Sequence, residues 1–293
     1  MSPIRILGVI GGSGLYELES FSRVREEQIK TPFGSTSSPV LIGDLGDIRV
    51  VFISRHGRRH QLTPGEVPYA ANIYALKELG VQWVLAFSAV GSLREEVHPG
   101  HVVLPDQLID RTRGGRRSSF FGEGVVGHIP FAEPFCPSLR SLLFDTVRES
   151  GGKVHNGGTL VVMEGPAFST RAESMMYRAW GAHIIGMTSL PEAKLAREAE
   201  LCYCTVALCT DYDCWRDDGE AVNVNAVLHV MKQNGTLARQ IIRRMAYSLT
   251  HHTPNPCLCN HATDHAIMTY NITGADEDRL RLIIGRHLPI VGK

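Results

Sequence analysis

The sequence has no excess of charge of either sign, since 30 Lys and Arg residues balance 30 Asp and Glu residues in a chain of 293. It also lacks any apolar run near the roughly 20 residues that cross a bilayer. The apolar stretch 6–15 is interrupted by four glycines and follows no basic segment, which is unlike a secretion signal. We therefore expect a cytoplasmic protein without nucleic-acid or membrane partners, in which any anion site is local.

Cysteine is present, but not in a pattern that indicates a secreted disulfide framework. In a chain of this length without a secretion signal, seven cysteines are more typical of buried or redox-active thiols. Because the number is odd, at least one must stay outside any intrachain disulfide. The seven are Cys136, Cys202, Cys204, Cys209, Cys214, Cys257 and Cys259.

Short β-branched runs alternate with amphipathic helical stretches, among them 69–79 and 139–147. This alternation predicts one α/β domain with a central mixed, mostly parallel β-sheet flanked by helices. The segment Arg111–Gly127, rich in Gly, Arg and Ser, is expected to be a long surface loop, either a lid or an interface arm. Strands are expected at Arg5–Ile10, Ile48–Ser54, Trp83–Ser88, His101–Leu104, Thr159–Met163, His183–Met187 and Cys202–Cys209.

Two capping-box patterns, at 170–173 and 189–192, predict helices that each begin just after a strand. The residues in front of these boxes, 168–169 and 187–188, are then expected at strand ends. Asp211, which follows the buried run ending at Cys209, should lie on the same edge of the sheet. Ligands of open α/β sheets bind beyond the carboxyl ends of the strands.

Asp211 and Asp213 are the most informative pair on that edge. Side chains two residues apart on a strand share a face and lie about 6.6 Å apart along it. Carboxyl groups at this spacing suit an amine-bearing ring such as a 6-aminopurine, whereas a 6-oxopurine would favour an amide donor. A solvated acidic turn is the simpler interpretation of the pair taken alone.

Two other strand ends carry residues that favour an anion. Gly11–Gly14 gives converging backbone amides and the hydroxyl of Ser13, although a simple glycine turn explains it equally well and the spacing is wrong for a dinucleotide site. Arg55 and His56 begin the second motif, which ends at His60. Its three guanidinium groups would repel a metal cation, so an oxyanion is the better guest.

Three more segments of small, aromatic or sulfur-containing residues complete the set. The segment 88–92 permits close approach of a ligand to the backbone, or simply tight packing. Phe168 suits stacking on a base and Met187 suits packing against a sugar, although both residue types are more often part of a core. Their joint position on the edge of Asp211 favours a ligand.

With these segments in order, residues 4 to about 270 resemble the trimeric purine nucleoside phosphorylase superfamily and, within it, the S-methyl-5'-thioadenosine phosphorylases. That resemblance implies the purine nucleoside phosphorylase fold. Several motifs in frame are far more specific than one alone. The motifs are GGSG, RHG, NIYALKELG, HIPFAEPFC, EGPAFSTRAE, MTSLPEAKLA and TDYDCW.

The resemblance implies phosphorolysis of methylthioadenosine to adenine and 5-methylthioribose 1-phosphate, with adenosine as a further substrate, inorganic phosphate as co-substrate and no metal or organic cofactor. It also implies a homotrimer or a dimer of trimers, because His128 would reach the 5' end of a neighbouring subunit's ligand. The implied contacts are Ser13, Arg55, His56, Ser88, Ala89 and Thr188 for phosphate, Met187 for ribose, Phe168, Ser169, Asp211 and Asp213 for the base, and Val224, Val227, Leu228 and His128 for the 5'-methylthio group.

The chain departs from the family pattern in two places. Phe87-Ser88-Ala89 stands where the family often has Thr-Thr-Ala, but Ser88 keeps a hydroxyl. The domain 1–270 is followed by an extension, 271–293, in which 276–288 is expected to form an amphipathic helix packed on the body or on a partner subunit.

Cleavage of an N-glycosidic bond leaves negative charge on the purine, which an acid must neutralise. We expect burial and the second carboxylate to raise the pKa of Asp211, so that it donates a proton toward N7 as the catalytic residue. Asp213 would accept from the 6-amino group. Phosphate would attack the anomeric carbon from the opposite side.

Other functions stay open. A 6-oxopurine nucleoside or methylthioinosine phosphorylase is the main alternative, and a hydrolytic nucleosidase or a dehydrogenase is less favoured. A non-enzymatic sensor of adenine nucleosides would bind ligand without releasing base.

The C-terminal pattern Cys257-x-Cys259-x-His261 with His265 resembles a zinc motif, but its C-x-C spacing is tighter than the usual C-x-x-C. Archaeal-type members of the family have a C-x-C near this point that is associated with disulfide chemistry. We rank a disulfide or reactive dithiol first, buried thiols second and a metal third.

Overall fold

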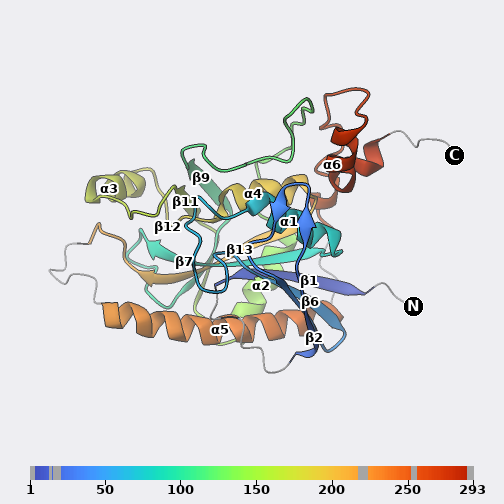
Figure 1. The fold of residues 1–293 in the computed structure, drawn as a ribbon. Coiled ribbons are helices and arrows are strands. Elements are labelled where there is room, and N and C mark those ends of the chain that lie inside the picture. Colours follow the sequence, from blue (N-terminus) through green and yellow to red (C-terminus); the bar gives the residue numbers. More distant parts are fainter. Residues whose placement is uncertain (1–3, 13–14, 16–20, 217–223, 252–255, 289–293) are drawn as a thin grey trace.

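Within the described residues, eleven strands form one mixed sheet, in the order β10-β8-β13-β7-β1-β6-β5-β2, with β12 on β7 and β11 and β9 beyond it (Figure 1). The computed structural model describes residues 4–12, 15, 21–216, 224–251 and 256–288, and only the backbone of 224–228. The strands are β1 (Arg5–Gly11), β2 (Ser22–Glu27), β5 (Val40–Leu45), β6 (Ile48–Ser54), β7 (Trp83–Ser92), β8 (Val102–Leu104), β9 (Gln107–Arg111), β10 (Val154–Asn156), β11 (Thr159–Met163), β12 (Ile184–Gly186) and β13 (Cys202–Asp211); β3 (Lys30–Thr31) and β4 (Gly34–Ser35) pair separately.

The centre of the sheet is parallel. Strands β6, β1, β7 and β13 pair in parallel, whereas β5, β8 and β12 join them antiparallel. The central strands are buried over most of their length, as expected when helices cover both faces of a parallel sheet. The predicted mixed, mostly parallel α/β sheet is confirmed.

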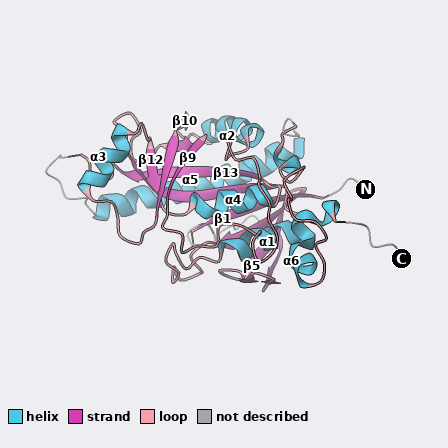
Figure 2. Ribbon diagram, turned by 90° about the horizontal axis from the view of Figure 1, so that it is seen from above, coloured by secondary structure: helices cyan, strands magenta, loops and turns pink. Residues whose placement is uncertain are grey.

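Helices cover both faces of the sheet (Figures 1 and 2). The long helix α5 lies with α2 on one face, and α1 and α4 pack together on the other, from which Figure 2 is viewed. None of the described helices is both long and apolar enough to span a membrane. The helices are α1 (Tyr69–Glu78), α2 (Pro137–Glu149), α3 (Arg171–Ala179), α4 (Ser189–Glu198), α5 (Val224–His251) and α6 (Ala275–Ile284), with 3₁₀ turns η2 (Cys259–His261) and η3 (Gly285–His287).

Of the two predicted capping boxes, one is confirmed and one is wrong. At the start of α3, the Thr170 hydroxyl accepts from the amide of Glu173, and the Glu173 carboxylate accepts from the amide of Thr170. At α4 the N-cap residue is Thr188, without a side-chain cap. The carboxylate of Glu192 is not available to the start of the helix, because it pairs with the buried guanidinium of Arg55.

The segment 111–127 is a loop over most of its length, but the expectation of a surface loop is wrong at its centre. Arg116 and Phe120 are buried.

Beyond the sheet, α6 buries Leu280, Ile283 and Ile284 and lies against α1. The helix expected at 276–288 is therefore shorter, and η3 follows it.

Candidate active site

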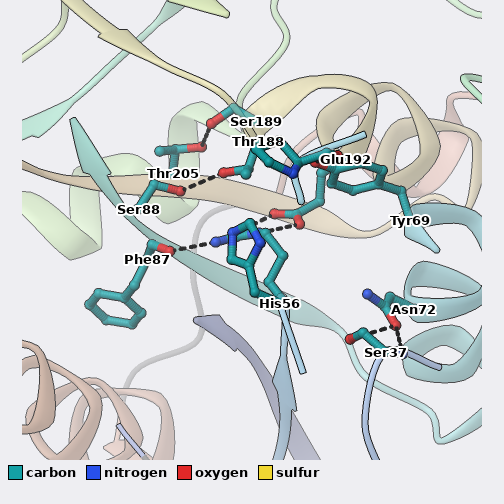
Figure 3. Close-up of polar contacts among 12 residues, drawn as sticks. Ser37, His56, Tyr69, Asn72, Phe87, Ser88, Thr188, Ser189, Glu192 and Thr205 are labelled. Atoms are coloured by element: carbon teal, nitrogen blue, oxygen red, sulfur yellow. Dashed lines mark hydrogen bonds and ion pairs between the residues drawn. The ribbon is translucent and has the colours of Figure 1, made fainter. Parts of the chain in front are cut away.

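Arg55 follows β6 directly and forms a buried ion pair with Glu192 of α4. Its Nε and Nη2 donate to the two carboxylate oxygens at 2.8 and 2.9 Å, and its Nη1 donates to the carbonyl of Phe87 at 2.8 Å (Figure 3). The side chains are only 3% and 1% exposed. Burial alone would lower the pKa of Arg55, but the carboxylate of Glu192 outweighs it and the pKa is raised.

This pair changes how Arg55 can meet an anion. The sequence predicted that its planar fork grips a phosphate, yet the edge formed by Nε and Nη2 is bound to Glu192. A guanidinium has five N–H donors, and the described contacts use three of them. One hydrogen on each Nη remains, so an anion would meet Arg55 through these.

His56, the next residue, is half-buried and neutral at pH 7. Its pKa is lowered to about 4, mainly by burial and further by the positive charge of Arg55. Nδ1 contacts the carbonyl of Leu62 at 2.8 Å, and since a carbonyl only accepts, Nδ1 carries the hydrogen. Nε2 therefore offers a lone pair, which suits a protonated oxygen of phosphate.

The hydroxyl groups of Ser88 and Thr188 lie near Arg55 and His56. Ser88 belongs to β7 and Thr188 follows β12, and their Oγ and Oγ1 atoms are 3.1 Å apart. Figure 3 draws this contact above His56. Thr188 begins α4 without capping it by its side chain, so its hydroxyl is not used by the helix. Ala89 is exposed next to Ser88. Arg55 reaches the carbonyl of Phe87, the residue before Ser88, so Arg55, His56, Ser88 and Thr188 lie in one region. Ser13 lies outside the described residues.

Arg116 holds the turn that carries Met187 and Thr188. Its Nη1 donates to the carbonyls of Met187 at 2.6 Å and Leu190 at 2.8 Å, and its Nη2 donates to the carbonyl of Glu164. Sequence reasoning missed Arg116, because an arginine in a Gly- and Ser-rich loop gives no signal of burial. It also missed the role of Glu192, because the capping-box pattern assigned this carboxylate to the start of its own helix.

Met187 packs closely against the backbone of Gly165. A Cβ added to Gly165 would lie 2.6 Å from Met187 Sδ, and Gly165 has a φ of +69°, so a larger residue is disfavoured there on both counts. The sequence motifs that contain Gly165 and Met187 are therefore brought together, as predicted.

Asp211 ends β13, and Asp213 lies in the turn that follows. The expectation that both project from one strand is therefore wrong. The amide of Asp213 donates to Asp211 Oδ1 at 3.0 Å, which folds the turn back. Both residues flank Gly91 of β7, since a Cβ there would meet Asp211 Oδ1 at 3.2 Å and Asp213 Cβ at 3.3 Å. Asp211 and Asp213 are therefore still neighbours, but through a turn and not as alternate residues of one strand.

The pKa of Asp211 is raised, first by burial and then by the charge of Asp213, although a hydrogen bond from Thr210 at 2.7 Å opposes the shift. The pKa of Asp213 is also raised, mainly by burial. Asp213 Oδ2 is buried without a well-formed hydrogen bond from the described residues, although the hydroxyl of Ser174 lies close enough to oppose the rise in the pKa of Asp213. Two buried carboxyl groups with raised pKa values suit the N7 and 6-amino edge of an aminopurine, which needs one donor and one acceptor.

The loop of Phe168 and Ser169 borders the acid pair. Cys214 Sγ donates to the carbonyl of Ser169 at 3.2 Å, which links this loop to the turn of Asp213. Phe168 is 83% exposed, an unusual state for a large aromatic residue that leaves its ring face open to a ligand. Both residues lie in the loop before α3 rather than at the end of β11.

The residues predicted for the 5' group are less completely described. Val224, Val227 and Leu228 lie in the first turns of α5, and their side chains are outside the described residues. His128 is exposed, and its amide donates to the carbonyl of Ala266 in the C-terminal segment at 2.8 Å. Its described hydrogen bond leads to that segment and not to the acid pair.

A model of the "Phosphorylase superfamily" matches residues 6–246. The chain is 50% identical over 286 residues to the S-methyl-5'-thioadenosine phosphorylase of Geobacter sulfurreducens, covering 97% of this chain and 99% of that one. A methylthioadenosine phosphorylase from an Antarctic soil metagenomic library has a similar structure, with a TM-score of 0.91 at 41% identity over 96% of this chain and 99% of that one. The Schistosoma mansoni methylthioadenosine phosphorylase in complex with adenine has a TM-score of 0.80 at 37% identity, over 85% and 93%.

Proposed function

Because the chain belongs to the phosphorylase superfamily, we propose that it cleaves S-methyl-5'-thioadenosine with phosphate to give adenine and 5-methylthioribose 1-phosphate. It is a pentosyltransferase of the S-methyl-5'-thioadenosine phosphorylase type, as its relatives are. Inorganic phosphate is the co-substrate.

One observation carries the proposal: the hydroxyls of Ser88 and Thr188 and the carboxyl groups of Asp211 and Asp213 border the same strand, β7. Ser88 and Gly91 are three residues apart in β7, which corresponds to about 10 Å along a strand. Thr188 lies beside the first and Asp211 beside the second. This spacing suits one nucleoside, with its purine edge at the aspartates and its anomeric carbon toward the hydroxyl groups.

On the phosphate side, the two remaining Nη hydrogens of Arg55, the Nε2 atom of His56, and the hydroxyls of Ser88 and Thr188 surround the nucleophile. We include Ala89, through its backbone, and Ser13 in this set by resemblance. The neutral His56 accepts a hydrogen bond from a protonated phosphate oxygen. Bound phosphate also stabilises the positive charge that develops on the sugar.

On the base side, Asp211, whose pKa is raised by burial, acts in its protonated form and donates toward N7 as the glycosidic bond breaks. Asp213 Oδ2 accepts from the 6-amino group. Phe168 stacks on the ring, Ser169 borders it, and Met187 holds the ribose. Arg116 acts as a positioning residue, because it fixes the turn of Met187 through two carbonyl groups.

The 5'-methylthio group is assigned to Val224, Val227 and Leu228, since an apolar wall offers no partner to a 5'-hydroxyl. His128 of a neighbouring subunit completes this pocket in a homotrimer or a dimer of trimers.

We further propose that residues 1–270 form the catalytic domain and that residues 271–293 form an extension. Sedimentation equilibrium measures the assembly, and His128→Ala should raise the KM for methylthioadenosine while the control His261→Ala leaves it unchanged.

The deciding experiment measures release of free base from methylthioadenosine with and without phosphate, beside inosine. We expect adenine only when phosphate is present. Release without phosphate would indicate a hydrolase, faster cleavage of inosine would indicate a 6-oxopurine enzyme, and binding without release would indicate a sensor.

A further inference from the structure

Four cysteines from three separate parts of the sequence meet at one point, next to the start of α2. The sulfur atoms of Cys136, Cys202, Cys257 and Cys259 all lie within 4.8 Å of one another, and those of Cys202 and Cys257 are 3.3 Å apart. Cys136 precedes α2, Cys202 begins β13, and the other two belong to the segment that follows α5. No described residue other than these four contributes a ligand atom to the cluster.

The cluster differs from the pattern that the sequence suggested. Cys257 and Cys259 had His261 and His265 as their nearest metal-binding companions in the chain. In the structure His261 is instead 2.9 Å from Asp264, and both residues are outside the cluster. Two thiols from the body of the protein, Cys136 and Cys202, complete the set.

We propose that these four cysteines bind one structural zinc ion. Zinc bound tetrahedrally by four thiolates has Zn–S bonds near 2.3 Å, which separates the sulfurs by about 3.8 Å. One pair of sulfurs is 3.3 Å apart and all the others are within 4.8 Å, which is compatible with this value. Two disulfides require only that sulfurs approach in pairs, whereas a shared ion requires all four to converge.

The surroundings of Cys136 suit a metal-bound thiolate. Its sulfur is the N-cap of α2, a helix of 13 residues, and accepts a hydrogen bond from the amide of Leu139 at 3.4 Å. The positive end of the helix dipole and such N–H donors stabilise negative charge on sulfur. Cys136 and Cys259 are each 1% exposed, while Cys202 and Cys257 are half-buried, which leaves a path for the ion.

The ion would attach the C-terminal segment to the body of the protein. Cys259 begins η2, and a few residues later Ile267 pairs with Gly127 while the carbonyl of Ala266 accepts from the amide of His128. The segment that borders His128 is thus held at one end by the four sulfurs. Zinc binding itself does not depend on the proposed function and is measured without any assay of activity.

The test begins with the full-length wild-type protein, expressed with added zinc and purified in an oxygen-free buffer without reductant, so that native thiols and disulfides are both preserved. Metal analysis and native mass spectrometry should find about one zinc per chain. An organomercurial reagent, which caps thiolates, should release it. Purified protein with two disulfides, with four free thiols and no metal, or with iron in place of zinc would overturn the proposal.

Single substitutions assign the ligands. Cys257→Ser and Cys259→Ser should each lower the zinc content to well under half of the wild-type value. Cys204→Ser is the matched control, because Cys204 is buried in the same strand as Cys202 but is not part of the cluster. Equal zinc in all three variants would refute the assignment, and the wild-type measurements decide the matter if a variant does not fold.

Discussion

The carboxylate of Glu192 accepts hydrogen bonds from both Nε and Nη2 of Arg55, a residue 137 positions away in the chain. The hydroxyl of Tyr203 donates to the same carboxylate at 2.8 Å. A buried charge without its partner is strongly destabilising. Arg55 is therefore held in place by Glu192 before any anion binds.

Glu192→Gln should lower the free energy of unfolding by about 3–5 kcal/mol, because the guanidinium of Arg55 loses its counter-charge while remaining buried. The KM for phosphate should rise as well, since Arg55 is no longer oriented. Urea unfolding and phosphate titration measure the two effects. The control is Glu26→Gln, which removes a half-exposed partner of Arg58 and should change stability by only about 0–1 kcal/mol. Similar losses in both variants would contradict the role of the buried pair.

Asp211→Ala should lower kcat/KM for methylthioadenosine by about 100- to 10,000-fold, the range expected for the loss of a general acid. A variant that keeps nearly wild-type kcat/KM would show that another group, or water, protonates the base.

Thr210→Val should change the pH dependence of the reaction. The hydrogen bond from Thr210 lowers the pKa of Asp211, so its removal should raise that pKa further. The proposed acid works only in its protonated form, so activity should fall as pH rises through the pKa of Asp211. The alkaline limb of kcat/KM should therefore move to higher pH, and a shift to lower pH would rule out Asp211 as the acid.

Asp213→Asn should favour 6-oxopurine nucleosides, because an amide can donate where the buried Oδ2 atom now only accepts. The ratio of inosine to adenosine cleavage should rise by roughly tenfold or more, since an unmatched buried polar group costs about 1–3 kcal/mol. Asp110→Asn, which alters a half-exposed carboxylate paired with Lys194 at 2.7 Å, is the control. An unchanged ratio would contradict the role of Asp213 in reading the base.

Glu198 makes stability depend on pH near neutrality. Burial raises its pKa to about 7, even though Ser119 and the amide of Phe120 donate to it at 2.7 and 2.6 Å. An unfolded Glu titrates near about 4.3. Its stabilising contribution is thus complete below about pH 4 and is lost as pH rises through about 7.

Glu198→Gln should remove this part of the pH dependence. Thermal unfolding between about pH 5 and 8 should show a flatter Tm profile than that of the wild type. Glu26→Gln, at an exposed site, should keep the wild-type slope. If the Glu198→Gln variant also keeps the wild-type slope of Tm against pH, Glu198 does not titrate in this range.

Features that depend on neighbours in the chain were predictable from the sequence. The strands at Ile48–Ser54 and Thr159–Met163 match the prediction at both ends. The capping box of Thr170 and Glu173 also formed as predicted, because its partners are three residues apart. The second box did not form, because Leu190 within it has an extended backbone and Glu192 pairs with Arg55, which only the folded chain brings near.

The positions of Asp211 and Asp213 were likewise predictable only in part. The sequence indicated that Asp211 ends a buried strand, because the apolar run before it is continuous. It did not indicate that Asp213 turns back toward Asp211, since that depends on one hydrogen bond from a backbone amide. The burial of Arg116 was equally hidden, because its partners are carbonyl groups more than forty residues away.

The sequence by itself determined the α/β alternation, the strand ends that carry the polar residues, and the resemblance to the family. These follow from local propensity, apolar periodicity and short motifs. Only the tertiary structure decided which charges are paired and which thiols meet, as in the cluster of Cys136, Cys202, Cys257 and Cys259. The physical reason is that burial makes unpaired charges costly and selects partners by distance in space, which the order of residues does not specify.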